Sequence, residues 1–483
     1  MTRPRMPNDY PSGSTESGAP DALDHAILSA LRERGIDVST VALDRAEHGR
    51  DWWPLSIPMV ESGCVPHWPG AVVRANSIDE ISAVLRIASE HRIAVTAQGG
   101  RSGVEGGAVA PDGAIALDLT AMDAIGPLDE VSGTVRVEAG VFGPDLERFV
   151  NAHGWTVGHF PQSFELATVG GWLACRGAGQ FSNRYGKIED IVRGLTVVLA
   201  SGDIAELGGR GPRQAVGPDL VQLFVGSEGS LGVIASATLA LHRRPDAELR
   251  AAYSFASFGK GLEACRRIVQ RGAHPAVLRL YDATESRRSF DATGCVLIVL
   301  EEGDGALVEA VMAIVTDECR TGENIGPAHV ERWLEHRNDV SALAPLWNQG
   351  LVVDTIEVGG PWSVLDVMND HVHEVLGALP EIIVVSTHQS HAYSDGACLY
   401  FTFAAKAEGD STSLYRRIWD MATAAVLEDG GSLSHHHGVG RNRARFVPAA
   451  LGSGFPVLES LKSTLDPRNI LNPGVLGLGG PAW

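Results

Sequence analysis

The chain has 483 residues, of which 44% are hydrophobic and 20% are charged, a balance typical of a globular protein with real cores. Its formal net charge of −20 repels phosphate backbones and anionic membranes, so we expect no nucleic-acid partner. The 6 cysteines form no CxxC pair, which argues against a disulfide framework or a structural zinc site and favours a reducing compartment. No signal-peptide pattern and no run of ~18 apolar residues occurs, so we expect a cytoplasmic protein without a transmembrane segment.

The expected helices and strands are mixed without strict alternation, which indicates an α+β fold. Helical apolar spacing covers residues 21–34, and a capping-box pattern at Ser77 and Glu80 predicts a helix that ends near Arg92. In the first half, strands are expected over 93–97, 114–119, 134–141, 195–203 and 230–242, and a helix over 143–154. In the second half, helices are expected over 259–272, 362–379 and 414–428, and strands over 276–282, 294–302, 381–388 and 398–405.

The texture of the sequence changes near residue 245, where Arg243-Arg244-Pro245 ends a strand. We therefore place a domain boundary at this point. The predicted divisions are a frayed tail over 1–20, a helical segment over 21–62, a first domain over 63–245, a second domain over 246–430, and a C-terminal helical segment over 431–483 that returns to the first domain and the active site.

Three glycine-rich stretches in the first domain can hold a cofactor. They are Gln98–Gly103 directly after a strand, Ala167–Gly171 before a helix, and Val225–Ile234 leading into a strand. Glycines let backbone N–H groups approach an anion without a Cβ in the way. Each stretch alone has a second interpretation as an ordinary turn in a glycine-rich chain, but together they indicate a dinucleotide held between two subdomains.

In order, the motifs QGGRSG, PQSFELATVGGWLACRGAG, YGKIEDIV, GPDL and GSEGSLGVI resemble the FAD-binding domain of the vanillyl-alcohol oxidase/PCMH flavoprotein superfamily over roughly residues 50–245. The resemblance implies FAD between two α+β subdomains, with its pyrophosphate on the first glycine loop, and it makes residues 246–430 the cap, or substrate, domain. The implied FAD contacts are Ala97, Gln98, Gly99, Gly100, Arg101, Ser102, Gly103, Gln162, Ser163, Thr168, Gly170, Gly171, Ala174, Cys175, Arg176, Gly177, Glu228, Gly229, Gly232, Val233 and Ile234.

Two features of these motifs bear on how the FAD is attached. Arg101 stands where a third glycine is common in the superfamily. The loop RSGVEGG lacks the histidine of covalently linked members, so the resemblance implies noncovalent FAD. Cys175, in an implied flavin contact, is the alternative covalent anchor.

The C-terminal half is similar to the alkyldihydroxyacetonephosphate synthases, so that the resemblance covers about residues 45–475. The segment Ser434-His-His-His-Gly438 matches their histidine triplet, where hydroxyacid dehydrogenases usually carry Glu-His-Gly. The segment HAYSDGACLYF matches the stretch that holds their catalytic tyrosine, which falls on Tyr393. The closing Asp466-Pro467 to Asn472-Pro473-Gly474 looks more like the hydroxyacid dehydrogenases. We expect a homodimer that acts on a small-molecule or lipid-like substrate.

The resemblance implies chemistry at flavin N5, with Tyr393 removing a proton beside a carbonyl. A tyrosine is a poor base at its ~10 reference pKa, so we expect His435, His436 and His437 to lower that pKa as imidazolium neighbours. The implied substrate contacts are Arg279, Arg337 and His391. Where the synthases carry a phosphate-binding arginine, this chain has Leu343 or Ala344, which puts a phosphorylated substrate in doubt.

Each of these residues also has a plainer interpretation. Tyr393 can be a core tyrosine, and Arg279 can pair with Asp282 as structure instead of facing the site. The triplet can be solvated surface or a metal site, but adjacent residues on a strand point to opposite faces and cannot all bind one ion. We therefore predict no metal, with His435 and His437 facing the flavin and His436 behind them.

The sequence leaves three functions open. The first is a flavoenzyme with redox-neutral exchange chemistry like that of the synthases. The second is an FAD-dependent oxidoreductase that oxidises a D-2-hydroxyacid or another alcohol. The third is a flavin-binding protein without turnover, which the joint presence of Tyr393 and the triplet argues against.

Overall fold

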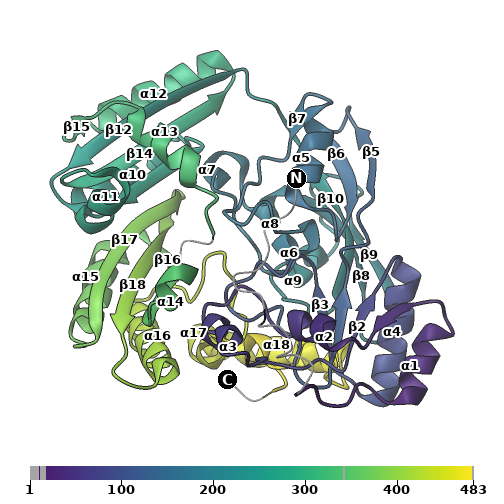
Figure 1. The fold of residues 1–483 in the computed structure, drawn as a ribbon. Coiled ribbons are helices and arrows are strands. Elements are labelled where there is room, and N and C mark those ends of the chain that lie inside the picture. The colour runs from purple at the N-terminus through teal and green to yellow at the C-terminus, as the bar shows by residue number, and fades with distance from the viewer. Residues whose placement is uncertain (1–9, 11–17, 341–342, 481–483) are drawn as a thin grey trace.

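The computed structural model describes residues 10, 18–340 and 343–480, and it places two sheet systems side by side (Figure 1). The predicted tail lies outside the described residues at 1–9 and 11–17. Tyr10 itself is buried, and its hydroxyl donates to the Ala46 carbonyl oxygen at 3.3 Å. No helix within the described ranges combines the length and apolar character that crossing a membrane requires.

The first half contains two main sheets. A mixed sheet has the order β1 (Asp37–Ser39), β2 (Ala71–Arg74), β4 (Ile115–Asp118) and β3 (Val95–Gln98), with β2, β4 and β3 parallel. An antiparallel sheet has the order β5 (Ile125–Asp129), β6 (Thr134–Glu138), β10 (Val233–Ala240), β8 (Val192–Val198) and β9 (Ile204–Gly208). A short ribbon pairs β11 (His242–Arg243) with β7 (Trp155–Thr156).

Helices cover both sheets of this half: α1 (His25–Arg32), α2 (Ala42–His48), α3 (Ser56–Glu61), α4 (Ile78–His91), α5 (Gly143–Asn151), α6 (Val169–Ala174), α7 (Ser182–Tyr185), α8 (Ile188–Ile191) and α9 (Leu220–Phe224). Helix α4 begins as predicted, because Ser77 Oγ accepts the Glu80 N–H at 3.2 Å. The Glu80 carboxylate accepts the Asn76 N–H at 2.8 Å. The helix ends at Arg92 in the left-handed conformation.

The second half is one seven-stranded antiparallel sheet. Its order is β15 (Glu323–Asn324), β12 (Ala247–Phe255), β14 (Cys295–Gly303), β13 (Val277–Tyr281), β17 (Ile382–Ala392), β18 (Gly396–Lys406) and β16 (Leu351–Pro361). The helices of this half are α10 (Phe258–Gln270), α11 (Ala283–Phe290), α12 (Gly305–Glu318), α13 (Ala328–His336), α14 (Ala344–Trp347), α15 (Trp362–Gly377) and α16 (Ser411–Glu428).

The outer face of this sheet carries the larger core. Alternate residues of β18, namely Leu399, Phe401 and Phe403, are fully buried against α15 and α16. Trp53, from the N-terminal segment, joins the same core, and its Nε1 donates to Tyr415 Oη at 2.9 Å. The N-terminal segment therefore helps to fix the second half, which its sequence position did not predict.

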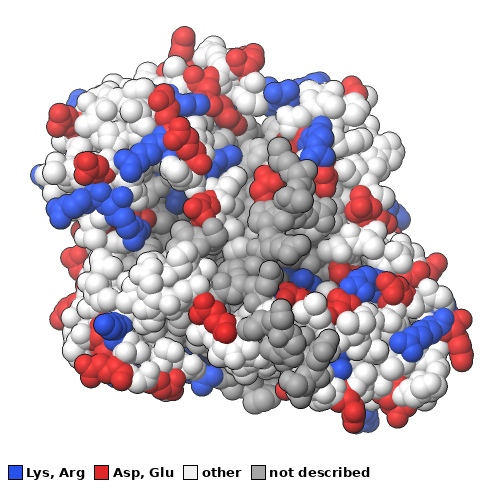
Figure 2. Space-filling model, in the orientation of Figure 1, with Lys and Arg blue, Asp and Glu red and all other residues white. Residues whose placement is uncertain are grey.

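The C-terminal segment, with α17 (Val447–Leu451) and α18 (Phe455–Leu465), lies below the two halves in Figure 1. Leu471 forms a parallel bridge with Val95 of β3. The buried Lys462 Nζ donates to the Ser230 and Leu471 carbonyl oxygens at 3.0 and 2.7 Å. Acidic and basic side chains of the described residues are interspersed over the face in Figure 2, and no basic stripe crosses that face.

Candidate active site

A cavity of about 810 Å³ lies between the two halves. Every residue predicted to contact FAD lines this cavity except Arg176, whose side chain instead binds Gln222 at 2.8 Å. Arg279, Arg337, His391, His436 and His437 line the cavity too, whereas Tyr393 and His435 do not. The structure therefore brings the predicted cofactor and substrate residues together around one cavity, whereas Tyr393 and His435 of the predicted catalytic set do not line it.

The glycines of the first loop are required by the contact between two loops. A Cβ at Gly99 would overlap Thr168 Oγ1, and a Cβ at Gly100 would overlap the Leu166 carbonyl oxygen. Thr168 also caps α6, since its Oγ1 accepts the Gly171 N–H at 3.3 Å. The predicted glycine stretches thus pack directly on each other and form one wall of the cavity.

Arg101 provides positive charge at this wall. It adopts a left-handed φ of 52°, and its Nε is shielded from solvent with no hydrogen-bond partner among the described residues. A shielded guanidinium needs an anion nearby, because leaving it unpaired is costly. The diphosphate of a dinucleotide meets this need, so the loop residues fit FAD.

Cys175 lines the same wall as a protonated thiol. Burial raises the pKa of this thiol to about 12. Its Sγ lies 3.7 Å from the Trp172 carbonyl oxygen. A thiol in this state is a weak nucleophile near neutral pH.

One face of the seven-stranded sheet forms the opposite wall. Strand alternation points Arg279 and Tyr281 of β13, His388 and Ser390 of β17, and Tyr400 and Thr402 of β18 into the cavity. Tyr400 lies directly opposite His388 on one neighbouring strand and Glu357 on the other. Tyr400 was not among the predicted site residues, although its alternation with Leu399 and Phe401 was a signal for it.

The histidine triplet does not alternate as a strand would. Residues 435–437 form a bend, and the backbone N–H groups of His435, His436 and His437 all donate to the carboxylate of Glu357, at 2.7, 3.2 and 2.9 Å. The structure differs from the expectation that His435 and His437 would share the cavity face. His436 and His437 line the cavity, whereas the His435 ring lies behind them and stacks on His391, 5.1 Å between centroids.

His435 instead contacts Tyr393, and neither residue lines the cavity. Tyr393 Oη lies 2.9 Å from His435 Nε2, and His435 Nδ1 lies 3.0 Å from His436 Nδ1. The Tyr393 carbonyl oxygen accepts the Trp362 Nε1–H at 2.9 Å, which fixes the turn that holds this tyrosine. The hydroxyl that faces the cavity next to the triplet belongs to Tyr400, 3.5 Å from His437 Nε2.

The protonation states differ from the expected imidazolium and phenolate. Burial lowers the pKa of His435 to about 3 and that of His437 to about 4, so both rings are neutral at pH 7. Burial also raises the pKa of Tyr393 and Tyr400 above the usual value for tyrosine. Neutral histidines do not lower a tyrosine pKa as imidazolium neighbours would, so these shifts do not support that part of the hypothesis.

Two guanidinium groups flank the ring of Trp333 on the cavity wall. The Cζ atoms of Arg279 and Arg337 lie 5.4 and 5.8 Å from its centroid. Arg279 donates to His388 Nε2 at 2.8 Å, and Arg337 donates to Gln180 Oε1 at 3.0 Å. Among the described residues neither guanidinium forms an ion pair, and Asp282, the proposed partner of Arg279, instead caps α11 through the Glu285 N–H at 2.7 Å.

Leu343 and Ala344 also line the cavity, with apolar side chains. Arg337, an implied substrate contact, lines the same cavity. Arg288 and Arg332, which the sequence analysis did not single out, line the cavity as well.

Four potential metal ligands lie close together beside the triplet: Glu357, Cys398, His435 and His436. Their atoms are already engaged with one another. Glu357 Oε2 accepts two backbone N–H groups, and the two histidine Nδ1 atoms face each other at 3.0 Å. The carboxylate therefore has its acceptor positions filled by the protein.

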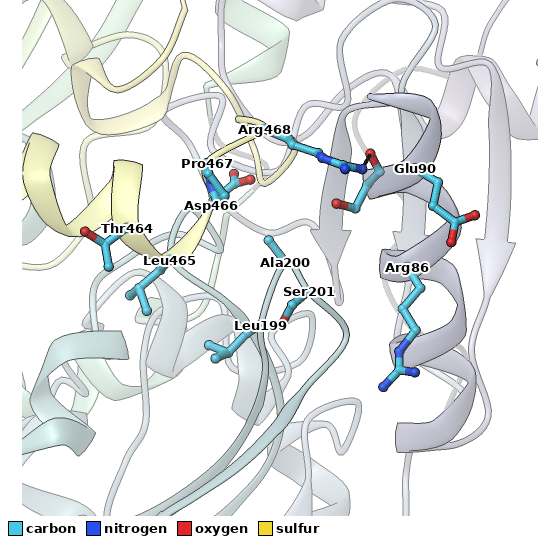
Figure 3. Close-up of a pocket in the computed structure, with 11 residues that line it drawn as sticks. Arg86, Glu90, Leu199, Ala200, Ser201, Thr464, Leu465, Asp466, Pro467 and Arg468 are labelled. Carbon is cyan, nitrogen blue, oxygen red and sulfur yellow. Dashed lines mark hydrogen bonds between the residues drawn. The ribbon is translucent and has the colours of Figure 1, made fainter.

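A second pocket, of about 410 Å³, lies apart from this site between α4 and the turn after α18 (Figure 3). Arg468 crosses it and donates to the Ser89 carbonyl oxygen at 2.6 Å. Asp466 turns inward and binds Lys462 Nζ at 2.6 Å. No residue of this pocket was predicted to be functional.

The chain is similar to several known proteins. It is 31% identical to the uncharacterized FAD-linked oxidoreductase YgcU of Escherichia coli O157:H7 over 84% of this chain and 89% of that protein. It is 28% identical to the alkyldihydroxyacetonephosphate synthase of Trypanosoma brucei brucei, over 88% and 75% of the two chains. It is also 28% identical to the glycolate oxidase subunit GlcD of Bacillus subtilis, over 84% and 88%.

Solved structures give the same result. An alkyldihydroxyacetonephosphate synthase structure matches with a TM-score of 0.80 at 25% identity, covering 97% of this chain and 89% of that one. A p-cresol methylhydroxylase structure matches with a TM-score of 0.75 at 17% identity, over 98% of each chain, which confirms the PCMH-type α+β fold. Residues 69–208 match the FAD binding domain family, and residues 244–476 match the C-terminal domain of FAD linked oxidases. The chain therefore belongs to the FAD-linked oxidoreductase family and is an FAD-binding flavoenzyme.

Proposed function

We propose that this flavoenzyme acts on a hydroxy- or oxo-bearing carbon of an anionic substrate, with Tyr400 and His437 handling the protons. The observation that carries the proposal is the position of Tyr400, which faces the cavity 3.5 Å from His437 Nε2 and opposite the FAD loops. Bound FAD supplies the electron-accepting ring. Tyr400 takes the role that the resemblance implied for Tyr393, because Tyr400 lines the cavity, whereas Tyr393 is not among the residues that line it.

The protonation states assign the two roles. His437 is neutral at pH 7, because burial lowers its pKa to about 4, which makes it a weak base that accepts a proton only as charge develops at the bound substrate. Tyr400, with a pKa raised by burial, keeps its hydroxyl proton and donates a hydrogen bond. A substrate oxygen can thus be held by Tyr400 while His437 takes up a proton from the substrate.

Arg279 and Arg337 are the proposed anion contacts. Each has a neutral partner, an imidazole and an amide, so their positive charges are not cancelled by an ion pair among the described residues. A carboxylate or phosphate between them and the ring of Trp333 would form charge-assisted hydrogen bonds. Since Leu343 and Ala344 are apolar, the substrate's anionic group would bind on the Arg337 side of the cavity.

We favour exchange chemistry that leaves no net oxidation, which the resemblance to the alkyldihydroxyacetonephosphate synthases implies. Such a reaction moves several protons, and the cavity wall offers Tyr400, His437, His436 and His388 for them. Oxidation of a D-2-hydroxyacid is the second candidate, and similarity to a glycolate oxidase subunit supports it. Anaerobic mixing with glycolate or D-lactate separates the two, because bleaching of the yellow flavin means oxidation.

The protonated state of Cys175 supports noncovalent FAD. Acid precipitation should therefore release all flavin to the supernatant, and flavin that stays with the pellet would contradict this. A homodimer and a cytoplasmic location remain proposals, which size-exclusion chromatography with light scattering and cell fractionation can test.

Paired tyrosine variants test the assignment of the base system. Tyr400→Phe should keep the fold and FAD but slow turnover on the order of 10²-fold or more, the scale of a lost proton-transfer group. Tyr393→Phe should have a clearly smaller effect, because Tyr393 does not line the cavity and its hydroxyl lies 2.9 Å from His435 Nε2. The reverse order of the two losses would restore Tyr393 and overturn the proposal.

A further inference from the structure

The carboxylate of Glu357 has an unusual set of partners. It is fully buried on β16 and accepts hydrogen bonds from three consecutive backbone N–H groups, those of His435, His436 and His437. Its Oε1 also accepts the Ser434 hydroxyl at 2.5 Å. Every residue of the segment 434–437 thus donates to one carboxylate.

Three successive N–H groups converge on one anion only where the backbone bends, and this arrangement forms a concave anion-binding site. The anion here is part of the protein. Arg443, which is fully buried, balances its charge from the far side, donating to Glu357 Oε1 at 3.3 Å and to the Leu433 carbonyl oxygen at 2.6 Å. Glu357 can therefore stay ionised in the interior, because the backbone N–H groups and the Arg443 guanidinium both bind its carboxylate.

This bend determines where the three imidazoles point. In an extended segment His435 and His437 would share one face. With all three N–H groups turned to Glu357, His435 faces Tyr393 at 2.9 Å, while His436 and His437 line the cavity. His437 then lies 3.5 Å from the Tyr400 hydroxyl, on the strand next to β16.

We propose that Glu357 is a positioning residue, whose carboxylate binds the backbone of the histidine triplet and so sets which imidazoles face the cavity. The bend itself does not depend on any assigned reaction. Its consequence for turnover rests on the proposed function, in which His437 receives the proton.

Hydrogen exchange on the FAD-bound protein tests this directly. In Glu357→Gln, which keeps the side-chain volume but places an N–H₂ against backbone donors, the amides of 435–437 should exchange on the order of 10- to 100-fold faster. Glu357→Asp keeps the charge but withdraws it by one methylene group. The exchange rates of the 435–437 amides in this variant should therefore lie between those of the unmodified protein and those of Glu357→Gln. Glu147→Gln is the matched control, because Glu147 is a buried carboxylate that accepts the Val157 N–H at 2.8 Å outside the cavity lining.

A second measurement reports the accessibility of the His436 and His437 imidazole rings. Diethyl pyrocarbonate should modify His436 and His437 at rates that change several-fold in Glu357→Gln and not in Glu147→Gln, measured by peptide mass mapping. A purely structural role predicts faster exchange throughout the second half, in proportion to lost stability, and that result would overturn the proposal. Unchanged exchange at 435–437 would also overturn it.

Two further outcomes have assigned meanings. About one bound divalent metal per chain in the unmodified protein, lost in Glu357→Gln, would replace the positioning role by a metal site. If Glu357→Gln does not fold, Glu357→Asp carries the test alone, and protection equal to that of the unmodified protein would then refute the role. Tyr400→Phe should leave these amides protected while losing turnover, so failure of the proposed function is distinguishable from failure of this inference.

Discussion

Removing the charge of Arg443 should be among the most damaging single substitutions in this protein. Its guanidinium is fully buried and donates to Glu105 Oε1 at 2.8 Å and to the Glu357 carbonyl oxygen at 2.8 Å. Arg443→Met keeps much of the side-chain volume but leaves the carboxylates of Glu105 and Glu357 without their cation. Loss of one partner of a buried ion network costs about 3–5 kcal/mol of unfolding free energy.

Urea unfolding of the apoprotein at pH 8, followed by tryptophan fluorescence, measures this loss. Arg445→Met is the control, because Arg445 pairs with the exposed Asp420 at 2.7 Å near the surface, where such a pair contributes about 0–1 kcal/mol. In Arg443→Met the carboxylate of Glu357, whose pKa is held at about 2 chiefly by the charge of Arg443, should bind a proton when the chain folds, so the deficit should shrink as the pH falls from 8 to 6. A deficit below about 1 kcal/mol, or one that does not change with pH, would refute the ion-network argument.

Two further predictions concern pH and the FAD loops. Burial raises the pKa of Glu105 to about 8 and those of Asp51 and Glu228 to about 7, so their contribution to apoprotein stability is present below about pH 4 and is lost as the pH rises toward 8. Buried neutral histidines such as His435 and His437 act in the opposite direction up to about pH 6.5, where they are protonated only in the unfolded chain. The urea midpoint should therefore fall between pH 7 and pH 8, and a rise over this range would contradict these shifts. Gly100→Ala should weaken FAD binding by about tenfold or more, because its Cβ would overlap the Leu166 carbonyl oxygen, whereas Gly377→Ala in α15, where a Cβ has open space, should leave FAD affinity unchanged.

Local patterns predicted much of the fold. The Ser77 cap begins α4 and the chain turns at Arg92 as expected, because both depend on residues within one helix. The two glycine loops meet in the cavity because Gly99 and Gly100 pack against Thr168 and Leu166, which belong to the second motif. The entry of Trp53 into the core of the second half was missed, since its partner Tyr415 lies 362 residues away and no local pattern joins them.

The site was predicted less completely, for a reason visible in β17 and β18. The motif match placed the catalytic tyrosine on Tyr393, but Tyr393 follows a register shift between Ser390 and Ala392, at the turn that joins the two strands. Tyr400 lies within the regular part of β18, where it alternates with the buried Leu399 and Phe401. Periodicity selects Tyr400 as a tyrosine that faces the cavity, because a polar residue between buried apolar neighbours on a strand faces the side away from the core.

Strand periodicity does not predict where the side chains of the histidine triplet point. Alternation applies to backbone that pairs with a strand, whereas residues 435–437 pair with one carboxylate. That carboxylate is 78 residues from His435, and the arginine that balances it also binds Glu105 on the loop beside the FAD-binding glycines. The direction of each histidine therefore depends on contacts from three distant segments. Those contacts join the FAD loop to the triplet through buried charges. A substitution at Glu105, Glu357 or Arg443 should therefore change the positions of the histidines that line the cavity.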